Sequence, residues 1–357
     1  MMWVTLLFNR KKSGVVGVDI GSASVKLVAL SKRGDGFLLD GFAVVPLPEK
    51  AFTDGTIQNL EEVAEAINKG LRLCATQSTL AATSVAASDV ITKEIQLSQL
   101  FQGLELEEQV RIEADQFIPY SLDEVALDFE VLGPVHGNSA FNVINIVAAR
   151  RDDVSMREEA LELAGLNCSI VDVDTFIMER LLSKSRFETG EAVGLIDVGA
   201  EAVTFYAMEK GVVTYHREQN FGGHQLLEQL KKTVKHPELS LSALLLDAAL
   251  PEESAPIIAG FAKNVGQQVS RALQLYYSSG SQDPLSTLFV FGGLTELPGL
   301  CDQVFKEAGI PVERLDPFES IELSAHVNGQ RFTQEKSALV KALGLAKRCL
   351  ENDDDLN

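Results

Sequence analysis

The chain has 357 residues, of which 46% are hydrophobic and 23% are charged, so it is long and apolar enough to form two compact lobes. Its formal net charge is −20, and such an acidic surface repels DNA, RNA and anionic lipid. Composition therefore argues against disorder, against a nucleic-acid partner and against a membrane-spanning class.

The N-terminal half is expected to open with three strands joined by tight turns. Residues 15–20 are mostly β-branched, a Gly-Ser turn follows at 21–24, and the next two strands end near residues 30 and 45. A Rossmann fold opens differently, because there the glycine turn leads into a helix. The further elements expected in this half are helices over 59–75, 104–117, 152–164 and 175–182, and strands over 81–86, 125–132, 141–149 and 170–173.

The opening pattern returns in the second half, after a polar stretch at 183–191 that we expect to mark a boundary between lobes. Leu-Ile-Asp-Val-Gly at 195–199 repeats Gly-Val-Asp-Ile-Gly at 17–21. We interpret this as an internal repeat of the start of the first lobe. The elements expected here are strands over 192–197, 202–209, 211–217 and 288–291, and helices over 225–234, 257–277 and 335–350.

The first turn has the chemistry of a phosphate site. Gly21 permits a tight turn, and successive turn N–H groups form a concavity that binds anions. Ser22 and Ser24 add hydroxyl donors, and Lys26 on the next strand can reach back to a phosphate. Asp19 can hold Mg²⁺ through water, since Mg²⁺ keeps much of its hydration. The alternative is an ordinary hairpin with a solvated lysine.

Two further elements point to the same chemistry. Asp197 and Gly199 repeat the Asp-x-Gly of the first turn in the other half, so two turns facing each other would clamp phosphates from both sides. The strand over 288–291 ends in Gly292 and Gly293, which lack a Cβ and let the backbone approach adenine or ribose. Each element alone is also compatible with an ordinary turn.

Together the three elements resemble the phosphate-1, phosphate-2 and adenosine motifs of the actin-like ATPase superfamily, and the segments 172–174 and 341–346 resemble its connecting segments. The resemblance implies an α/β fold with two ribonuclease H-like lobes around a nucleotide cleft that binds ATP and Mg²⁺. The nucleotide-binding residues that it implies are Gly21, Ser22, Ala23, Ser24, Lys26, Gly199, Ala200, Glu201, Gly222, Gly223, Gly292 and Gly293, with Asp19 and Asp197 at the metal and Asp174 as the candidate catalytic residue.

Within that superfamily the segments Glu-Ala-Asp-Gln-Phe-Ile-Pro-Tyr at 113–120 and Ala-Leu-Gln-Leu-Tyr-Tyr-Ser at 272–278 are similar to the PilM family of type IV pilus assembly proteins. That family is similar to the cell-division protein FtsA, which implies a subdomain inserted in the first lobe. The domain limits expected from the resemblance are 14–87 and 166–185 with the helix 335–350 for the first lobe, 88–165 for the insert and 186–334 for the second lobe.

The family resemblance also implies a role and a place in the cell. It implies a cytoplasmic ATP-binding scaffold, peripheral at the inner membrane, that grips the N-terminal cytoplasmic peptide of PilN and contacts other pilus assembly proteins. The membrane is then reached only through these partners, although the apolar start at 1–8 leaves a direct contact open. Candidate peptide-lining residues are Phe117, Ile118, Leu127 and Phe129, which otherwise belong to the core of the insert.

Two alternatives to the scaffold remain open on the sequence. An enzyme would need a group that orients the attacking water, and Asp174 is the candidate for that role in an ATPase that is at most slow. A filament former like actin or FtsA would use the insert for contacts between subunits.

Overall fold

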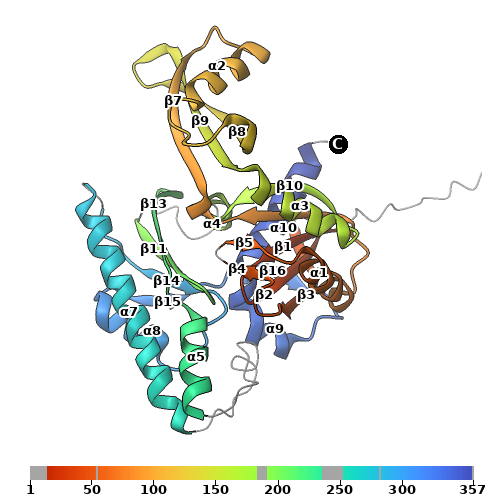
Figure 1. Ribbon diagram of the computed structural model, residues 1–357, viewed down its shortest axis with the longest axis vertical. Coiled ribbons are helices and arrows are strands. Elements are labelled where there is room, and N and C mark those ends of the chain that lie inside the picture. Colours follow the sequence, from red (N-terminus) through yellow and green to blue (C-terminus); the bar gives the residue numbers. More distant parts are fainter. Residues whose placement is uncertain (1–13, 54, 183–190, 235–251, 281–282, 356–357) are drawn as a thin grey trace, which may run out of the picture.

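A computed structural model describes residues 14–53, 55–182, 191–234, 252–280 and 283–355. Two mixed sheets form its two lobes (Figure 1). In spatial order the first sheet contains β10 (Asn167–Val173), β6 (Leu80–Val85), β1 (Val15–Ile20), β2 (Ser24–Arg33), β3 (Gly36–Pro46) and β16 (Ile321–Leu323). The second contains β13 (Val212–Gln219), β12 (Val203–Glu209), β11 (Val193–Val198), β14 (Leu288–Phe291) and β15 (Val312–Arg314).

The two sheets share one topology. In each sheet, three consecutive strands pair antiparallel. Two strands from later in the chain extend the sheet on the free side of the first strand, and both pair in parallel. The first strands, β1 and β11, are buried along their whole length, as expected of central strands with apolar sequences. The repeat read from the sequence is therefore a repeat of the whole sheet, in the ribonuclease H-like arrangement.

Helices cover the faces of both sheets. Helix α1 begins where the Asn59 side chain accepts a hydrogen bond from the Glu62 N–H, and it ends at Ala75 in a left-handed conformation. Helix α10 lies directly over β1, so closely that a Cβ on Gly17 would lie 1.9 Å from the carbonyl oxygen of Ala342. The helices are α1 (Leu60–Cys74), α2 (Leu104–Ala114), α3 (Arg151–Leu163), α4 (Asp174–Leu182), α5 (Gly223–Val234), α7 (Ala255–Ser278), α8 (Leu300–Ala308), α9 (Gly329–Glu335) and α10 (Val340–Asp355).

A small subdomain projects from the first lobe, at the top of Figure 1. It consists of the antiparallel sheet β7 (Val90–Ser98), β9 (Asn138–Arg150) and β8 (Val125–Val135), with α2 packed on it. It has a separate apolar core that includes Val110, Ile144 and Ile146. The short hairpin β4 (Phe52–Thr53) and β5 (Thr56–Ile57) and the 3-10 turn η1 (Ala87–Asp89) lie where the insert joins the lobe.

Some elements differ from the sequence-based expectation. Helix α3 falls inside the range 88–165 expected for the insert, yet its Ala160 and Leu161 belong to the core of the first lobe with α1. Strand β16 falls inside 186–334, yet it pairs with β3 in the first sheet.

The C-terminal helix begins at Val340, after a 3-10 turn over Lys336–Leu339. Strand β7 and helix α8 were not anticipated, because β7 exposes polar side chains and α8 is short. The expected lobe boundary at 183–190 lies outside the described residues.

Candidate functional site

The first turn joins β1 to β2 and brings a carboxylate beside a lysine. Asp19 and Lys26 face each other across the two strands, with 3.3 Å between the Asp19 Oδ2 and the Lys26 Nζ. The N–H of Gly21 donates to the Ser24 carbonyl at 3.2 Å and closes the turn. A Cβ on Gly21 would lie 2.6 Å from the Lys26 Nζ, so glycine allows the lysine to fold over the turn.

The second turn joins β11 to β12 and repeats this geometry. The N–H of Gly199 donates to the Ala202 carbonyl at 3.0 Å, as Gly21 does to Ser24. Asp197 faces Thr204 across the strands, at the place where Asp19 faces Lys26. The second turn thus lacks a lysine of its own, and Asp197 obtains its cation from elsewhere in the chain.

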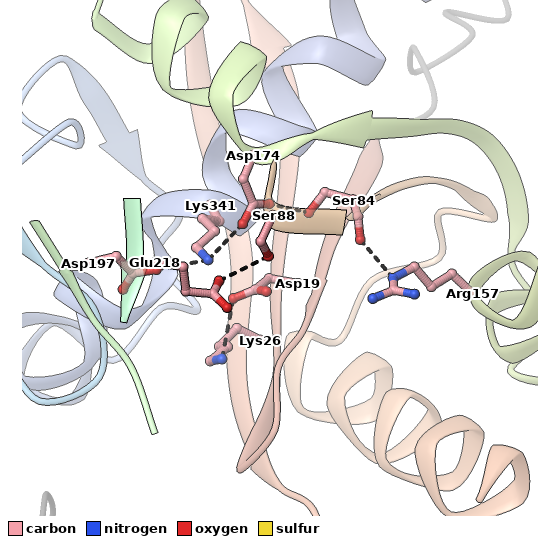
Figure 2. A network of polar contacts seen from close by, with 9 residues as sticks. All are labelled: Asp19, Lys26, Ser84, Ser88, Arg157, Asp174, Asp197, Glu218 and Lys341. Carbon is pink, nitrogen blue, oxygen red and sulfur yellow. Dashed lines mark hydrogen bonds and ion pairs between the residues drawn. The ribbon is translucent and has the colours of Figure 1, made fainter. Parts of the chain in front are cut away.

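That cation is Lys341 on α10, which bridges the two lobes (Figure 2). Its Nζ lies 2.8 Å from the Asp197 Oδ2 and 3.0 Å from the Asp174 Oδ2. Although burial by itself lowers it, the carboxylates of Asp174 and Asp197 raise the pKa of Lys341 well above its usual value. Lys341 is therefore charged at neutral pH and neutralises carboxylates from both halves.

Asp174, at the start of α4, has both carboxylate oxygens engaged. The Ser84 hydroxyl donates to its Oδ1 at 2.9 Å, while its Oδ2 pairs with Lys341. Asp174 is buried at the meeting point of β6, α4 and α10. Its present contacts hold the helices and the sheet together beside the cleft.

The paired glycines after β14 lie against the second turn. Gly292 has a positive φ of 103°, and a Cβ there would lie 2.4 Å from the Asp197 Oδ1. Only glycine fits this approach without displacing the carboxylate.

A cavity of about 360 Å³ lies between the two lobes and is lined by both turns. Thirteen of the fifteen site residues expected from the sequence line it: Asp19, Gly21, Ser22, Ala23, Ser24, Lys26, Asp174, Asp197, Gly199, Ala200, Glu201, Gly292 and Gly293.

The other two, Gly222 and Gly223, lie behind the second turn. The N–H of Gly223 donates to the Gly199 carbonyl at 3.1 Å, and a Cβ on Gly222 would lie 2.7 Å from the carbonyl oxygens of Gly199 and Ala200. These glycines thus support the turn from the start of α5.

The lining residues that were not expected from the sequence include Lys341, Arg157, Glu218 and Ser84. The segment that begins at Lys341 was predicted to be a connecting segment, but no role was predicted for the charge of Lys341. Arg157 sits in the middle of a helix with no recognisable motif around it, and only the fold brings it to the cleft. No spacing along the chain signals these positions.

The cleft contains a few charged side chains that could hold a metal ion and a phosphate. Among the residues that the structure describes, no cluster of three or more potential metal ligands occurs. Asp19 and Asp197 nevertheless line one cavity together with Lys26. Magnesium bound to phosphate uses one or two carboxylates and several waters, so two carboxylates suffice.

A second hollow of about 260 Å³ lies between the insert and the first lobe. Of the four insert residues singled out by sequence, Ile118 lines it, whereas Phe117, Leu127 and Phe129 pack against the core of the insert. The hollow is lined by Thr56, Ser88, Asp89, Val90, Ile91, Ile118, Tyr120, Val125, Ala148, Ala149, Arg150 and Asp153.

Comparison with known proteins agrees with this geometry. The sequence profile of the family described as type IV pilus assembly protein PilM matches residues 17–350. The structure is similar to that of a PilM–PilN type IV pilus biogenesis complex, at 24% identity over 94% of this chain and 98% of that one, with a TM-score of 0.77. It is also similar to the ethanolamine utilization protein EutJ of Carboxydothermus hydrogenoformans, at 15% identity over 93% and 88% of the two chains, with a TM-score of 0.53. The predicted two-lobed actin-like fold is confirmed.

Proposed function

This chain belongs to the family of the type IV pilus assembly protein PilM, and from that membership we propose that it is an ATP-binding scaffold that holds the N-terminal peptide of a PilN-type protein. We place it on the cytoplasmic side of the inner membrane, beside other pilus assembly proteins. Among the described residues, no helix has the length and hydropathy needed to cross a bilayer. The observation that carries the proposal is the pair of matching turns, one from each lobe, on the wall of a single cavity.

The charged side chains that line this cavity match the phosphates and the bound metal ion of Mg-ATP. Lys26 lies over the first turn, where it would contact a β- or γ-phosphate. Asp19 and Asp197 would hold Mg²⁺ through its water shell, and the bound Mg²⁺ would neutralise phosphate charge. Gly292 and Gly293 line the same cavity, and there we place the adenosine. Contacts to both turns at once would favour a closed arrangement of the lobes.

The peptide partner fits the second hollow. Its wall is apolar on the side of the insert, where Ile118, Val125 and Tyr120 lie, and carries Asp89 and Asp153 on the side of the lobe. An extended peptide with aliphatic side chains and a basic group matches such a groove. The structural relative with a TM-score of 0.77 is itself a complex of PilM with PilN.

A scaffold is favoured over a turnover enzyme by the state of Asp174. Each of its oxygens already has one partner, Ser84 or Lys341, so an attacking water would have to share an oxygen with one of them. We expect phosphate release that is slow at most. A phosphate-release assay decides, because rapid turnover that collapses in Asp174→Asn would identify the alternative, a true ATPase.

The proposal is tested by titrating a synthetic peptide of the PilN cytoplasmic N-terminus into the protein, with and without Mg-ATP. We expect the peptide to bind, and to bind more tightly with Mg-ATP. Lys26→Ala should weaken ATP binding and remove the effect of ATP on the peptide. Lys69→Ala, on the exposed face of α1, is the matched control and should behave as wild type. Peptide binding that is absent under all conditions contradicts the proposal.

A further inference from the structure

The two cavities share a wall. Ser88 and Asp89 line the cavity between the lobes and also the hollow beside the insert. Both belong to η1, the turn through which the chain passes from the first lobe into the insert. Gly55 also lines the first cavity, and the following residue, Thr56 at the start of β5, lines the second. Any shift of this wall therefore changes both cavities together.

Arg157 braces the wall from within the first lobe. This guanidinium is 3% exposed and donates to three backbone carbonyls, those of Ser84, Asp153 and Gly55, at 2.8 to 3.0 Å. Ser84 lines the first cavity and Asp153 lines the second, so one side chain ties both sides of the wall. These bonds hold the wall together, because removing any of them would leave a buried charge undersatisfied.

The second lobe reaches the same wall from β13. The Ser88 hydroxyl donates to the Glu218 Oε2 at 3.2 Å, across the cleft (Figure 2). Two residues earlier on the same face of β13, His216 lies close to the backbone of Ala87; burial lowers the pKa of His216, and this neighbouring backbone partly offsets the effect. Both contacts lie at the exposed rim of the cleft, where such bonds form and break at small cost in free energy.

We propose that η1 couples the two cavities: when nucleotide draws the lobes together, Glu218 and His216 of β13 press on Ala87 and Ser88 and reshape the peptide hollow on the other side. This inference rests on the proposed function and adds the element that transmits the effect. Another contact between the lobes, from Lys231 of α5 to Glu49 at 2.9 Å, involves no residue of either cavity or of η1. It supplies a control that also joins the lobes.

The test measures the affinity of the PilN peptide with and without Mg-ATP, and takes the ratio of the two dissociation constants. We expect a ratio of about fivefold in wild type, at the lower end of ordinary coupling. The comparison is made at Mg-ATP concentrations that saturate each variant, because Glu218 also lines the nucleotide cavity, whereas His216 does not. Glu218→Ala and His216→Ala should each bring the ratio toward one, whereas Lys231→Ala should keep it. A wild-type ratio that survives in both β13 variants overturns the inference and leaves the proposed function intact.

A second readout needs no peptide. Hydrogen exchange is followed in the segments 88–91 and 118–125, which contain the hollow-lining residues Ile118, Tyr120 and Val125, as a magnesium-bound non-hydrolysable ATP analogue is added. Wild type and Lys231→Ala should show slower exchange there, and Glu218→Ala should not. If nucleotide binds but exchange around the hollow is unchanged in wild type, η1 does not transmit the effect. Absence of peptide binding in the first assay, with this exchange response present, would count against the proposed partner and support the coupling.

Discussion

Lys341 is the residue on which the electrostatics of the cleft depend. Asp174 and Asp197 are both buried, and two buried carboxylates beside each other repel unless a cation lies between them. The lysine comes from the end of the chain, and its two partners come from different lobes. The two carboxylates are therefore both neutralised by Lys341 only when the two lobes lie in this relative position.

Replacing Lys341 by an uncharged residue should lower the free energy of unfolding. In Lys341→Met the two carboxylates lose their partner while remaining buried, and we expect a loss of about 3 to 5 kcal/mol in the free energy of unfolding. Lys232→Met removes a lysine from an exposed pair with Glu228 on α5, and should cost no more than about 0.5 kcal/mol. Urea denaturation of the two variants checks this. Equal losses would show that Lys341 is not the balancing charge.

Cys74 gives a pH-dependent prediction. Burial raises the pKa of its thiol to about 12, from 9.0 in the unfolded chain. Below pH 9 the thiol is neutral in both states, so its contribution to stability is complete there; it is lost as pH rises from 9 to 12, by about 4 kcal/mol over the range. The fall in unfolding free energy between pH 9 and 11 should therefore be shallower in Cys74→Ala than in Cys301→Ala. Parallel slopes would contradict the assignment.

Single site residues can be predicted from the sequence where they belong to a short local motif. The two Asp-x-Gly turns and the Gly-Gly pair after β14 lie on the cavity because each is a local motif at a strand end. Arg157 and Lys341 could not be found this way, since a charged residue within a helix reads as solvated until the packing of that helix is known.

At the scale of elements, the packing of α10 on β1 positions the site. Helix α10 passes over the middle of β1 at Gly17, and Gly344 of the helix lies against Ile177 of α4, where a Cβ would be 2.3 Å from the Ile177 Cγ2. One glycine at each of these two contacts lets the helix approach both the sheet and α4 closely. The same approach sets the position of Lys341 at the cleft.

A methyl group at this crossing should disturb both stability and the site. In Gly17→Ala the new Cβ would lie 1.9 Å from the Ala342 carbonyl and 2.6 Å from the Ala346 nitrogen, so the helix must shift. We expect a loss of at least about 2 kcal/mol, typical of overpacking, and weaker ATP binding. Gly36→Ala, where the nearest atom lies at 3.8 Å, is the control and should be close to neutral. Thermal unfolding and ATP titration of both variants test this, and a Gly17→Ala protein that unfolds and binds as wild type would contradict it.

The sequence predicted the central elements better than the peripheral ones. Strands β1, β11 and β14 carry apolar runs that only a buried strand explains, and their expected ranges nearly match the structure. Strand β16 was missed because three residues carry no periodicity, and its partner β3 lies far back in the chain. Helix α3 was placed in the insert because sequence order does not reveal that it packs against α1.

At the scale of the whole molecule, duplication explains the arrangement. Two copies of one sheet topology bring equivalent turns to face each other, so the cavity takes one phosphate-binding turn from each lobe. A ligand that contacts both turns must hold the lobes together. Ligand binding is thereby linked to the stability of the entire fold.

That linkage predicts a gain in stability with nucleotide. At a concentration of Mg-ATP one hundred times its dissociation constant, the free energy of unfolding should rise by about 2.7 kcal/mol. Lys26→Ala should gain less at the same concentration, because it lacks the phosphate-facing ammonium group. Thermal unfolding monitored by circular dichroism measures both, with Lys69→Ala as the matched control. A gain in Lys26→Ala as large as in wild type would remove Lys26 from the site.

The central claim is that one nucleotide lies between the two turns, with Asp19 on one side of its phosphates and Asp197 on the other. The most direct measurement is a crystal structure of the protein with Mg²⁺ and a non-hydrolysable ATP analogue. We predict triphosphate density between residues 21–24 and 199–201, a metal ion between the two carboxylates, and the adenosine against Gly292 and Gly293. Nucleotide bound elsewhere, or a cleft that stays empty at saturating analogue, would contradict the account.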